Sequence, residues 1–349
     1  MSNRSRRRAD RPRPAPPGFD VLTDVMEQVR LEAPVFFTSD MAAPYGIAVV
    51  REGRAPFYAV RAGECNVQVG DRAPRKVRAG DFLLLPGGAA HTVRSGPRAK
   101  VVPFDEWVAT HPMDHRGYLR HPGPGPVTRV TGGFFSAQSV KVNPLFAALP
   151  PLIHLRGSDP HVRQWLQPTL AFIDAEVASE QQGARTVLRR MADVLFIQAV
   201  RAYIAGQDRR TRGWLRGLTD RRIAKALAAI HEHYAEPWTL DALAREAGMS
   251  RTALAVTFKE LVGESPMAYL QRWRITRAAN ALRSEGLSLT RAAEAVGYRS
   301  DLVFAKAFKR ETGESPGRYR RGTAPSFSVR LPAAPSTRRA ARPSRSTAS

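Results

Sequence analysis

The sequence is poor in cysteine: Cys65 is the single one among 349 residues. One thiol excludes an intrachain disulfide framework, a cysteine-rich zinc module and a redox switch that needs two thiols in one chain. Because a free cysteine is usually a small buried hydrophobic residue, we favour that interpretation of Cys65 over a redox sensor.

Long apolar runs are also absent from the sequence. No stretch approaches the roughly 18 residues that a helix needs to span a bilayer. The N-terminal arginines are not followed by the apolar stretch of about 7–15 residues that a secretory signal requires. These absences predict a cytoplasmic protein without a membrane partner.

Acidic residues are scarce beside basic ones, with 31 Asp and Glu against 54 Lys and Arg and a formal net charge of +23. Such an excess favours a polyanionic partner, either nucleic acid or an anionic membrane surface. The lack of a membrane segment favours nucleic acid. Part of the excess lies in residues 1–18 and 322–349, which are rich in Pro, Ala, Ser and Arg. We expect both tails to be disordered.

Between the tails, the length and a hydrophobic content of 43% are typical of about two globular domains. Residues 19–142 begin with a helical pattern over 20–32 and continue with short apolar runs separated by Gly, Pro and Asp. This spacing predicts a small antiparallel β-barrel or sandwich. Within it, residues 110–126 are rich in His, Pro and Gly and are expected to form a loop.

The pattern turns helical in residues 143–206. Two segments there, 161–178 and 184–205, have broad apolar faces that could pack on each other, on the barrel or on a second subunit of a homodimer. Residues 207–219 are predicted to be a linker, and residues 220–321 to be an all-helical domain. The predicted fold class is therefore α+β, an antiparallel β-barrel with helices followed by an all-α domain.

An internal repeat is the strongest signal in the sequence, because residues 240–272 align with residues 290–321. The run Gly-Glu-Ser-Pro at 263–266 recurs at 313–316. In each copy a helix ends at Gly, a Ser caps a second helix, and Ser-Pro begins a third. Helix, tight turn and helix form the helix-turn-helix unit. The alternative is a generic helical repeat with solvated Lys and Arg, which the reuse of the whole motif disfavours.

The stretch that joins the two copies, residues 265–283, has the apolar spacing of one long helix. Such a helix would hold the two units about 30 Å apart at a rise of about 1.5 Å per residue. One turn of B-DNA measures about 34 Å. The second helices of the two units could therefore enter successive major grooves on one face of a duplex.

Because of this repeat and the long helix between its copies, the segment 220–321 resembles the C-terminal DNA-binding domain of the AraC/XylS family of bacterial transcription regulators. The stretch from Gly297 to Tyr319 fits the family signature. The resemblance implies a sequence-specific regulator, an activator with RNA polymerase as a partner, whose third and sixth helices read double-stranded DNA. The residues that we expect at the DNA are Ser250, Arg251, Thr252, Ala255, Val256, Lys259, Ser300, Asp301, Leu302, Lys306 and Lys309.

The roles expected within this set differ. Alignment with the family indicates that six positions face the bases: Thr252, Ala255, Val256, Asp301, Leu302 and Lys306. Ala255 and Val256 could touch a thymine methyl group but cannot hydrogen-bond a base edge. Arg251 and Lys259 can contact phosphates, which position a protein on DNA without specifying a sequence.

Residues 80–91 fit the second cupin motif on Gly80, Pro86, Gly88 and His91. The chain as a whole therefore resembles AraC-type regulators that carry a cupin-related sensing domain. This resemblance implies a small-molecule effector in the barrel, or a role for the barrel in dimerisation.

The first cupin motif, which should supply a His-x-His pair and a Glu, is incomplete. Residues 56–65 contain no histidine; Tyr58 stands in the corresponding position, and Glu64 is the one carboxylate. One His and one Glu cannot provide the three or four ligands of a metal site. We therefore predict no metal and no cofactor. Tyr58 and His91 could line an effector pocket, although a hydrogen-bonded barrel histidine is an equal interpretation of His91.

Other functions stay open as alternatives. A metal-dependent cupin enzyme fused to a DNA-binding domain would need the missing histidines, so we predict that the protein is not an enzyme. An architectural protein that coats DNA through its basic tails would bind with little sequence preference and a steep salt dependence. His111, His115 and His121 could bind a metal, but solvated histidines in a loop are the favoured interpretation.

Overall fold

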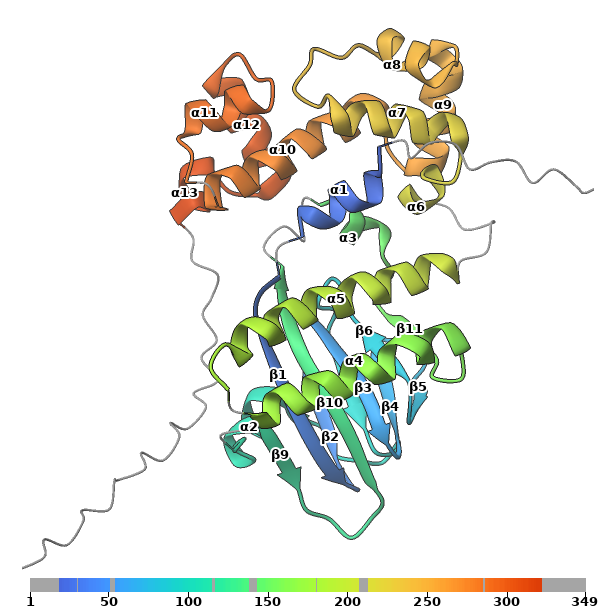
Figure 1. Ribbon diagram of the computed structural model, residues 1–349, viewed down its shortest axis with the longest axis vertical. Helices are drawn as coiled ribbons and strands as arrows, with labels where there is room; N and C mark the ends of the chain where they lie inside the picture. The colour runs from blue at the N-terminus through green and yellow to red at the C-terminus, as the bar shows by residue number, and fades with distance from the viewer. Residues whose placement is uncertain are drawn as a thin grey trace, which may run out of the picture. The chain divides into compact units, whose positions relative to one another are not determined.

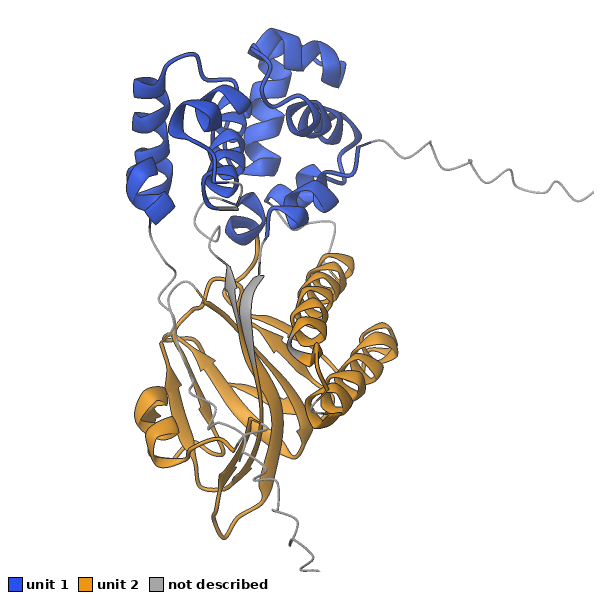
Figure 2. Ribbon diagram, turned by 60° about the vertical axis from the view of Figure 1, so that its left-hand side comes forward, with its two compact units in different colours: residues 1–30, 139–148, 207–322 blue, residues 31–138, 149–206, 323–349 orange. Residues whose placement is uncertain are grey.

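The structure is a computed structural model, which describes residues 19–29, 31–50, 54–114, 117–137, 143–179, 181–206, 213–284 and 286–321 (Figure 1). The described chain divides into two compact units, which Figure 2 shows in separate colours. The sheet unit comprises the described parts of residues 31–138 and 149–206. The helical unit comprises the described parts of residues 1–30, 139–148 and 207–322.

Two β-sheets form the sheet unit. The six-stranded sheet has the order β11 (Ile153–Leu155), β6 (Phe82–Leu84), β3 (Arg54–Ala62), β10 (Val127–Ala137), β1 (Leu31–Ala42), β9 (Tyr118–His121). The five-stranded sheet has the order β5 (Arg75–Arg78), β4 (Glu64–Val69), β7 (His91–Arg94), β2 (Gly46–Val49), β8 (Val102–Pro103). Side chains from both sheets, such as Tyr58 and Val67, meet in one apolar core. Alternate residues of β4 are buried, as expected for a strand with one face on this core.

The predicted α+β fold class is confirmed, and the sheets correct the antiparallel barrel expected within it. β1 pairs with β9 and β2 pairs with β8 in parallel, and the described strands form two separate sheets rather than a closed barrel. Parallel neighbours need a long connection instead of a tight hairpin. The long chain between β1 and β9 provides one, and it places a strand inside residues 110–126, where the composition predicted a loop.

Helices α4 (Pro160–Ser179) and α5 (Ala184–Ala205) lie across the six-stranded sheet (Figure 1). The Trp165 ring of α4 lies 6.3 Å from the Phe82 ring, centroid to centroid, and Arg61 of β3 makes a 2.9 Å ion pair with Asp174. Because the helices cover its second face, β3 is buried on both sides along most of its length. The helices predicted over 161–178 and 184–205 are thereby confirmed. A short helix, α2 (Phe104–Thr110), follows the five-stranded sheet in sequence.

The helical unit contains the repeat. Its elements are α6 (Trp214–Gly217), α7 (Arg221–Glu232), α8 (Leu240–Ala247), α9 (Arg251–Val262), α10 (Pro266–Ser284), α11 (Leu289–Ala295), α12 (Asp301–Thr312) and α13 (Pro316–Arg321). The pairs α8–α9 and α11–α12 are the two predicted helix-turn-helix units, and the 19-residue α10 is the predicted long helix. No helix within the described ranges is long and apolar enough to cross a membrane.

Two segments from outside the C-terminal block also belong to the helical unit. They are α1 (Val21–Glu27), predicted to belong to the barrel domain, and α3 (Pro144–Ala148), predicted to belong to the helical region that follows it. Val21 and Val25 of α1 are buried, and the Asn143 side-chain amide donates a 3.1 Å hydrogen bond to the Val25 carbonyl. The helical unit is thus assembled from three separate stretches of chain. The predicted linker contributes α6 to the same unit.

Candidate nucleic-acid interface and interior cavity

The same local signals position α9 and α12. Each preceding segment turns at a glycine with positive φ, Gly248 at 63° and Gly297 at 82°. No other residue type fits at position 297, because a Cβ there would lie 2.2 Å from the Ala235 carbonyl oxygen. The Ser250 hydroxyl then accepts the Ala253 N–H at 3.2 Å, and the Ser300 hydroxyl accepts the equivalent N–H in α12. Ser250 and Ser300, both predicted to lie at the DNA, are the N-caps of these helices.

Aromatic and aliphatic side chains fix the orientation of both helices. Leu254 and Phe258 of α9, and Phe304 and Phe308 of α12, are completely buried at i, i+4 spacing. Because side chains four residues apart share one face of a helix, the opposite faces are held toward solvent.

On α9, the exposed face carries a stripe of Thr252, Val256 and Lys259 at i, i+4 and i+7. Arg251 is also exposed, and its guanidinium lies 3.7 Å from the Asp241 carboxylate. Ala255 is half-buried and stands beside the stripe. The structure therefore gathers these predicted residues on one surface.

On α12, the equivalent stripe is Leu302, Lys306 and Lys309, all exposed. Asp301 differs from its neighbours, because it is half-buried and its carboxylate accepts a 2.6 Å hydrogen bond from the Thr290 hydroxyl of α11. This bond directs the Asp301 carboxylate toward α11. Val303 is exposed next to Leu302 and was not predicted to lie at the DNA, because the first copy of the repeat has an alanine, Ala253, at that position.

The charge on the two stripes is positive and unneutralised. Among the described residues, Lys259, Lys306 and Lys309 have no ion-pair partner. Ammonium groups that no carboxylate engages are suited to contact phosphates or the acceptor-rich edge of guanine.

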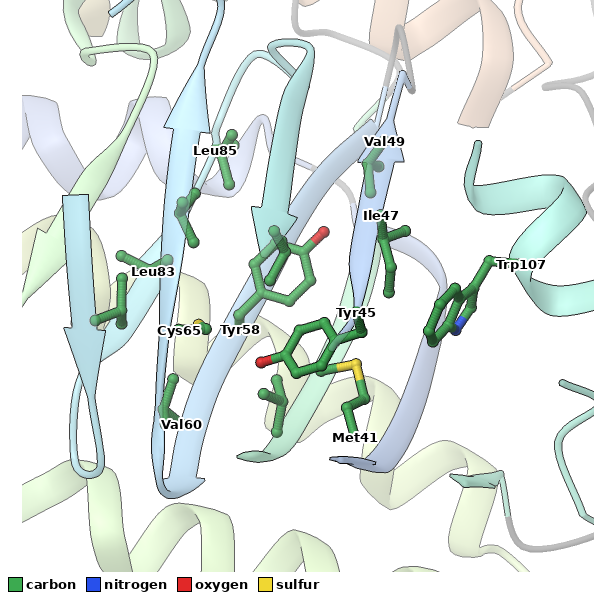
Figure 3. Close-up of a cluster of buried hydrophobic side chains, with 14 of the residues drawn as sticks. Met41, Tyr45, Ile47, Val49, Tyr58, Val60, Cys65, Leu83, Leu85 and Trp107 are labelled. Atoms are coloured by element: carbon green, nitrogen blue, oxygen red, sulfur yellow. The ribbon is translucent and has the colours of Figure 1, made fainter. Parts of the chain in front are cut away.

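A second feature lies inside the sheet unit: a cavity of about 40 Å³ whose walls are almost entirely apolar. Figure 3 shows Tyr58, Ile47 and Cys65 among the side chains that project into this interior from strands of both sheets. Leu83 and Trp107 also line it. An apolar cavity of this kind favours apolar over charged occupants, because charge loses its hydration there without compensation.

The predicted pair Tyr58 and His91 is brought together, with different roles. The Tyr58 hydroxyl lies 2.8 Å from His91 Nε2, and His91 Nδ1 lies 2.8 Å from the Ala89 carbonyl oxygen. Burial lowers the pKa of His91 to about 4, although the hydrogen bond to Ala89 opposes the shift. His91 is therefore neutral near pH 7. Tyr58 lines the cavity, whereas His91 is not part of the lining and contacts the Tyr58 hydroxyl.

Cys65 lies in the cavity wall, and burial raises the pKa of its thiol to about 12. A thiol that stays protonated at neutral pH is a poor nucleophile and a poor redox sensor. The observed burial agrees with the favoured interpretation of Cys65.

Two of the three clustered histidines meet beside Trp107, whose ring lines the cavity. His111 Nε2 lies 2.9 Å from His121 Nδ1, and both rings lie against Trp107, at 4.4 and 4.6 Å between centroids. Burial lowers the pKa of His121. His115 lies outside the described residues. The described part of the chain contains no group of three or more His, Cys, Asp or Glu side chains that could hold a metal ion.

Comparison with known proteins gives matches over both units. The family model described as Cupin matches residues 20–205, and the model described as Helix-turn-helix domain matches residues 243–322. An AraC-like transcription regulator of Streptomyces lividans is 34% identical over 266 residues, 76% of this chain and 86% of the relative. Another, from Streptomyces antibioticus, is 34% identical over 309 residues, 88% of this chain and 98% of the relative.

Among solved structures, the DNA-binding domain of AdpA in complex with a target DNA is 30% identical, with a TM-score of 0.28. The match covers 29% of this chain and 91% of that domain. The sequence relatives are transcription regulators, which is consistent with a protein that is not an enzyme.

Proposed function

Because the chain belongs to the AraC-like family of DNA-binding transcription regulators, with a cupin domain before its helix-turn-helix domain, we propose that α9 and α12 are recognition helices that enter successive major grooves of one operator. The observation that carries this proposal is the pair of exposed stripes at equivalent positions of α9 and α12, each ending in a lysine. The 19 residues of α10 between them span about 28 Å, close to one turn of B-DNA at about 34 Å.

The lysines have two roles: some position the protein on the DNA backbone, and one contacts a base. Lys259 and Lys309 lie in the last turns of their helices, where they meet the phosphate backbone and fix the register of the protein on the duplex. Lys306 lies mid-helix in the stripe, where it reaches the O6 and N7 acceptors of a guanine. Ser250 and Ser300 contribute as caps that orient both helices.

The test combines selection of an operator with a matched pair of variants. The full chain is used to select binding sites from randomised duplexes and from the promoter regions beside its own gene, and the bound sites are footprinted. We expect two protected blocks about 10 base pairs apart. Lys306→Ala should weaken binding to the selected site by about 1–3 kcal/mol while leaving non-specific binding nearly unchanged. Lys100→Ala removes the same charge from the exposed surface of the sheet unit and should leave the specificity ratio unchanged.

Weak binding to all sequences, with a steep salt slope, would contradict this proposal and favour the architectural alternative. An equal loss of specific and non-specific affinity in Lys306→Ala would reassign Lys306 to a phosphate contact.

For the sheet unit we propose that the cavity admits a small, uncharged, mainly apolar effector. Its almost entirely apolar walls support this class of ligand. The present free space of about 40 Å³ holds only a few atoms, so the walls must move apart when a larger molecule enters. Such a movement couples binding to the conformation of the unit, which any effector must do to change the protein's output.

Toluene and benzoate are suitable probes, because they are similar in size and differ in charge. Calorimetry and thermal unfolding of the full chain should detect toluene binding and no benzoate binding at neutral pH. Equal binding of benzoate, or stabilisation by neither compound, would contradict the proposal.

We also propose that the DNA-bound protein activates transcription by contacting RNA polymerase, as the family resemblance implies. Transcription in vitro from a promoter that carries the selected operator should rise when the protein and RNA polymerase are combined. A fall in transcript level would assign a repressor function instead.

The exposed Phe172 of α4 and Val194 of α5 support a homodimer contact through these helices. Phe172→Ser should shift the full chain toward monomer in sedimentation velocity experiments. An unchanged sedimentation profile would place any dimer contact elsewhere.

A further inference from the structure

Apolar side chains occupy part of both recognition stripes. Val256 on α9 is 52% exposed, and Leu302 and Val303 on α12 are 66% and 57% exposed. A single exposed apolar residue is ordinary on a protein surface. Here, however, the two copies of the repeat place such residues at the two reading positions. Val256 aligns with Lys306, and Leu302 aligns with Thr252.

Each helix thus offers one aliphatic and one polar side chain at equivalent positions. The order is reversed between the two helices, since the aliphatic residue lies in the first turn of α12 and one turn later in α9. The two helices therefore present different surfaces to DNA, although they share their caps and their buried faces.

An aliphatic side chain cannot exchange a hydrogen bond with a base edge. The apolar group that the major groove displays is the C5 methyl of thymine. Against another base, valine or leucine would cover polar edge atoms and displace their water without replacing the lost hydrogen bonds. Aliphatic residues at reading positions therefore discriminate in favour of thymine.

We propose that Val256 and Leu302 each recognise one thymine of the operator through its C5 methyl group, one in each half-site. This inference rests on the proposed function, because it requires α9 and α12 to lie in major grooves. Charge complementarity favours DNA as the occupant of this surface. Lys259 lies one turn beyond Val256, Lys306 lies one turn beyond Leu302, and neither lysine is paired with an acidic residue in the described chain. Val303 widens the apolar surface beside Leu302.

Deoxyuridine provides the test, because it differs from thymidine only in lacking the methyl group. Each thymine of the selected operator is replaced in turn by uracil, and the affinity of the full chain is measured for every duplex. Removal of one buried methyl group should weaken binding about four-fold. We expect this loss at one thymine in each half-site.

Two variants assign the thymines to side chains. Val256→Ala should abolish the uracil effect in one half-site, and Leu302→Ala should abolish it in the other. Both residues are exposed, so neither substitution disturbs the packed core. Lys306→Ala is the control: it should lower the affinity for thymine and uracil duplexes alike and keep their ratio.

A complementary experiment restores the methyl group on a different base. Replacing a recognised T·A pair by C·G should lower the affinity, and 5-methylcytosine at that position should recover part of the loss. An unmethylated and a methylated duplex that bind equally would overturn the role of the methyl group.

The remaining outcomes separate this inference from the proposed function. If the operator is bound specifically but no uracil substitution changes the affinity, the inference is wrong and the proposed function stands. A uracil effect that persists in both alanine variants assigns methyl recognition to other residues and also overturns the inference. An effect that only one variant removes overturns the assignment of the other residue. If selection yields no specific site, the proposed function itself fails.

Discussion

Each unit contains a buried histidine whose Nε2 lies beside a tyrosine hydroxyl, and the two histidines differ in the hydrogen-bond partner of Nδ1. In the sheet unit the Tyr58 hydroxyl lies 2.8 Å from His91 Nε2, and Nδ1 lies 2.8 Å from a backbone carbonyl. In the helical unit the Tyr269 hydroxyl lies 2.7 Å from His231 Nε2, and Nδ1 lies 2.7 Å from a carboxylate of α1. One histidine completes an apolar core, whereas the other joins a buried polar network.

The donor order in the helical unit follows from its tryptophan. Trp214 Nε1 can only donate, and it donates to the Tyr269 hydroxyl oxygen at 2.8 Å. The Tyr269 proton then points to His231 Nε2, so the neutral ring carries its hydrogen on Nδ1 and donates it to Asp24. The His91 ring has the same tautomer, because its Nδ1 faces a carbonyl that can only accept. Burial lowers the pKa of both histidines, and at His231 the Asp24 hydrogen bond opposes the shift.

The two tyrosine–histidine pairs connect similar lengths of chain, with 33 residues between Tyr58 and His91 and 38 between His231 and Tyr269. The difference lies in the partner of Nδ1, because Asp24 and His231 are 207 residues apart. Asp24 is also 3.3 Å from an Arg277 Nη atom of α10. The polar network therefore holds α1, which directly precedes the first strand of the sheet unit, as a component of the helical unit. Many combinations of apolar side chains can pack in a core, whereas a carboxylate that is shielded from water needs hydrogen-bond donors at particular positions.

The largest effect is expected from removing the imidazole of the helical unit. His231→Ala leaves the Tyr269 hydroxyl without its acceptor and takes one hydrogen-bond donor from the half-buried Asp24, which keeps Arg277. The two lost hydrogen bonds together cost about 3–5 kcal/mol. The free energy of unfolding of this unit should fall by that amount in a denaturant titration followed by tryptophan fluorescence. His233→Ala removes an exposed histidine nearby and should cost less than about 0.5 kcal/mol. Similar losses in both variants would show that the network adds no stability.

Acid should destabilise the sheet unit through His91. Its pKa is about 4 in the folded unit and about 6.5 in an unfolded chain. Between these values the unfolded chain binds a proton that the folded unit does not. The stability contributed by neutral His91 is therefore complete above about pH 6.5, and about 3 kcal/mol of it is lost as the pH falls to about 4.

Denaturant titrations at several pH values can isolate this contribution. The His91→Gln variant keeps the carboxylates, which titrate in both proteins, and lacks the imidazole. Parallel stability curves for wild type and variant between pH 7 and 4 would contradict the depressed pKa of His91.

A smaller effect is expected from neutralising the carboxylate of the helical unit. Asp24→Asn keeps the side-chain shape but removes the charge that faces His231 and Arg277, at a cost of about 2 kcal/mol. Hydrogen exchange of the α1 amides should become faster. Glu27→Gln neutralises an exposed carboxylate of the same helix and should leave exchange unchanged. Unchanged protection in Asp24→Asn would mean that apolar packing alone holds α1.

The smallest effect is expected at the tyrosine of the sheet unit. Tyr58→Phe removes one hydrogen bond to a neutral histidine, which contributes about 1 kcal/mol. Tyr203→Phe, at a half-buried hydroxyl with no hydrogen bond to another described residue, is the matched control for thermal unfolding. A loss of more than about 3 kcal/mol in Tyr58→Phe would show that this pair resembles the network of the helical unit after all.

The recognition helices could be predicted because their signals are local. The glycine turn, the capping serine and the i, i+4 apolar pair act within a few residues of one another, so they specify the same structure in both copies of the repeat. Local periodicity likewise predicted α4 and α5. The repeat was less informative at positions where one copy has a small residue and the other a larger apolar one. Val303 replaces an alanine of the first copy, and its exposure became evident only on the folded surface.

By itself, then, the sequence determined the two helix-turn-helix units, the long helix between them and the incomplete cupin motif. The tertiary structure decided that α1 and α3 join the helical unit, that the sheets are mixed, and that His231 finds its acceptor in Asp24. The physical reason is the range of the interactions. Caps and turns are closed by neighbouring residues, whereas the partner of a buried group 207 residues away depends on which surfaces pack together when water is excluded.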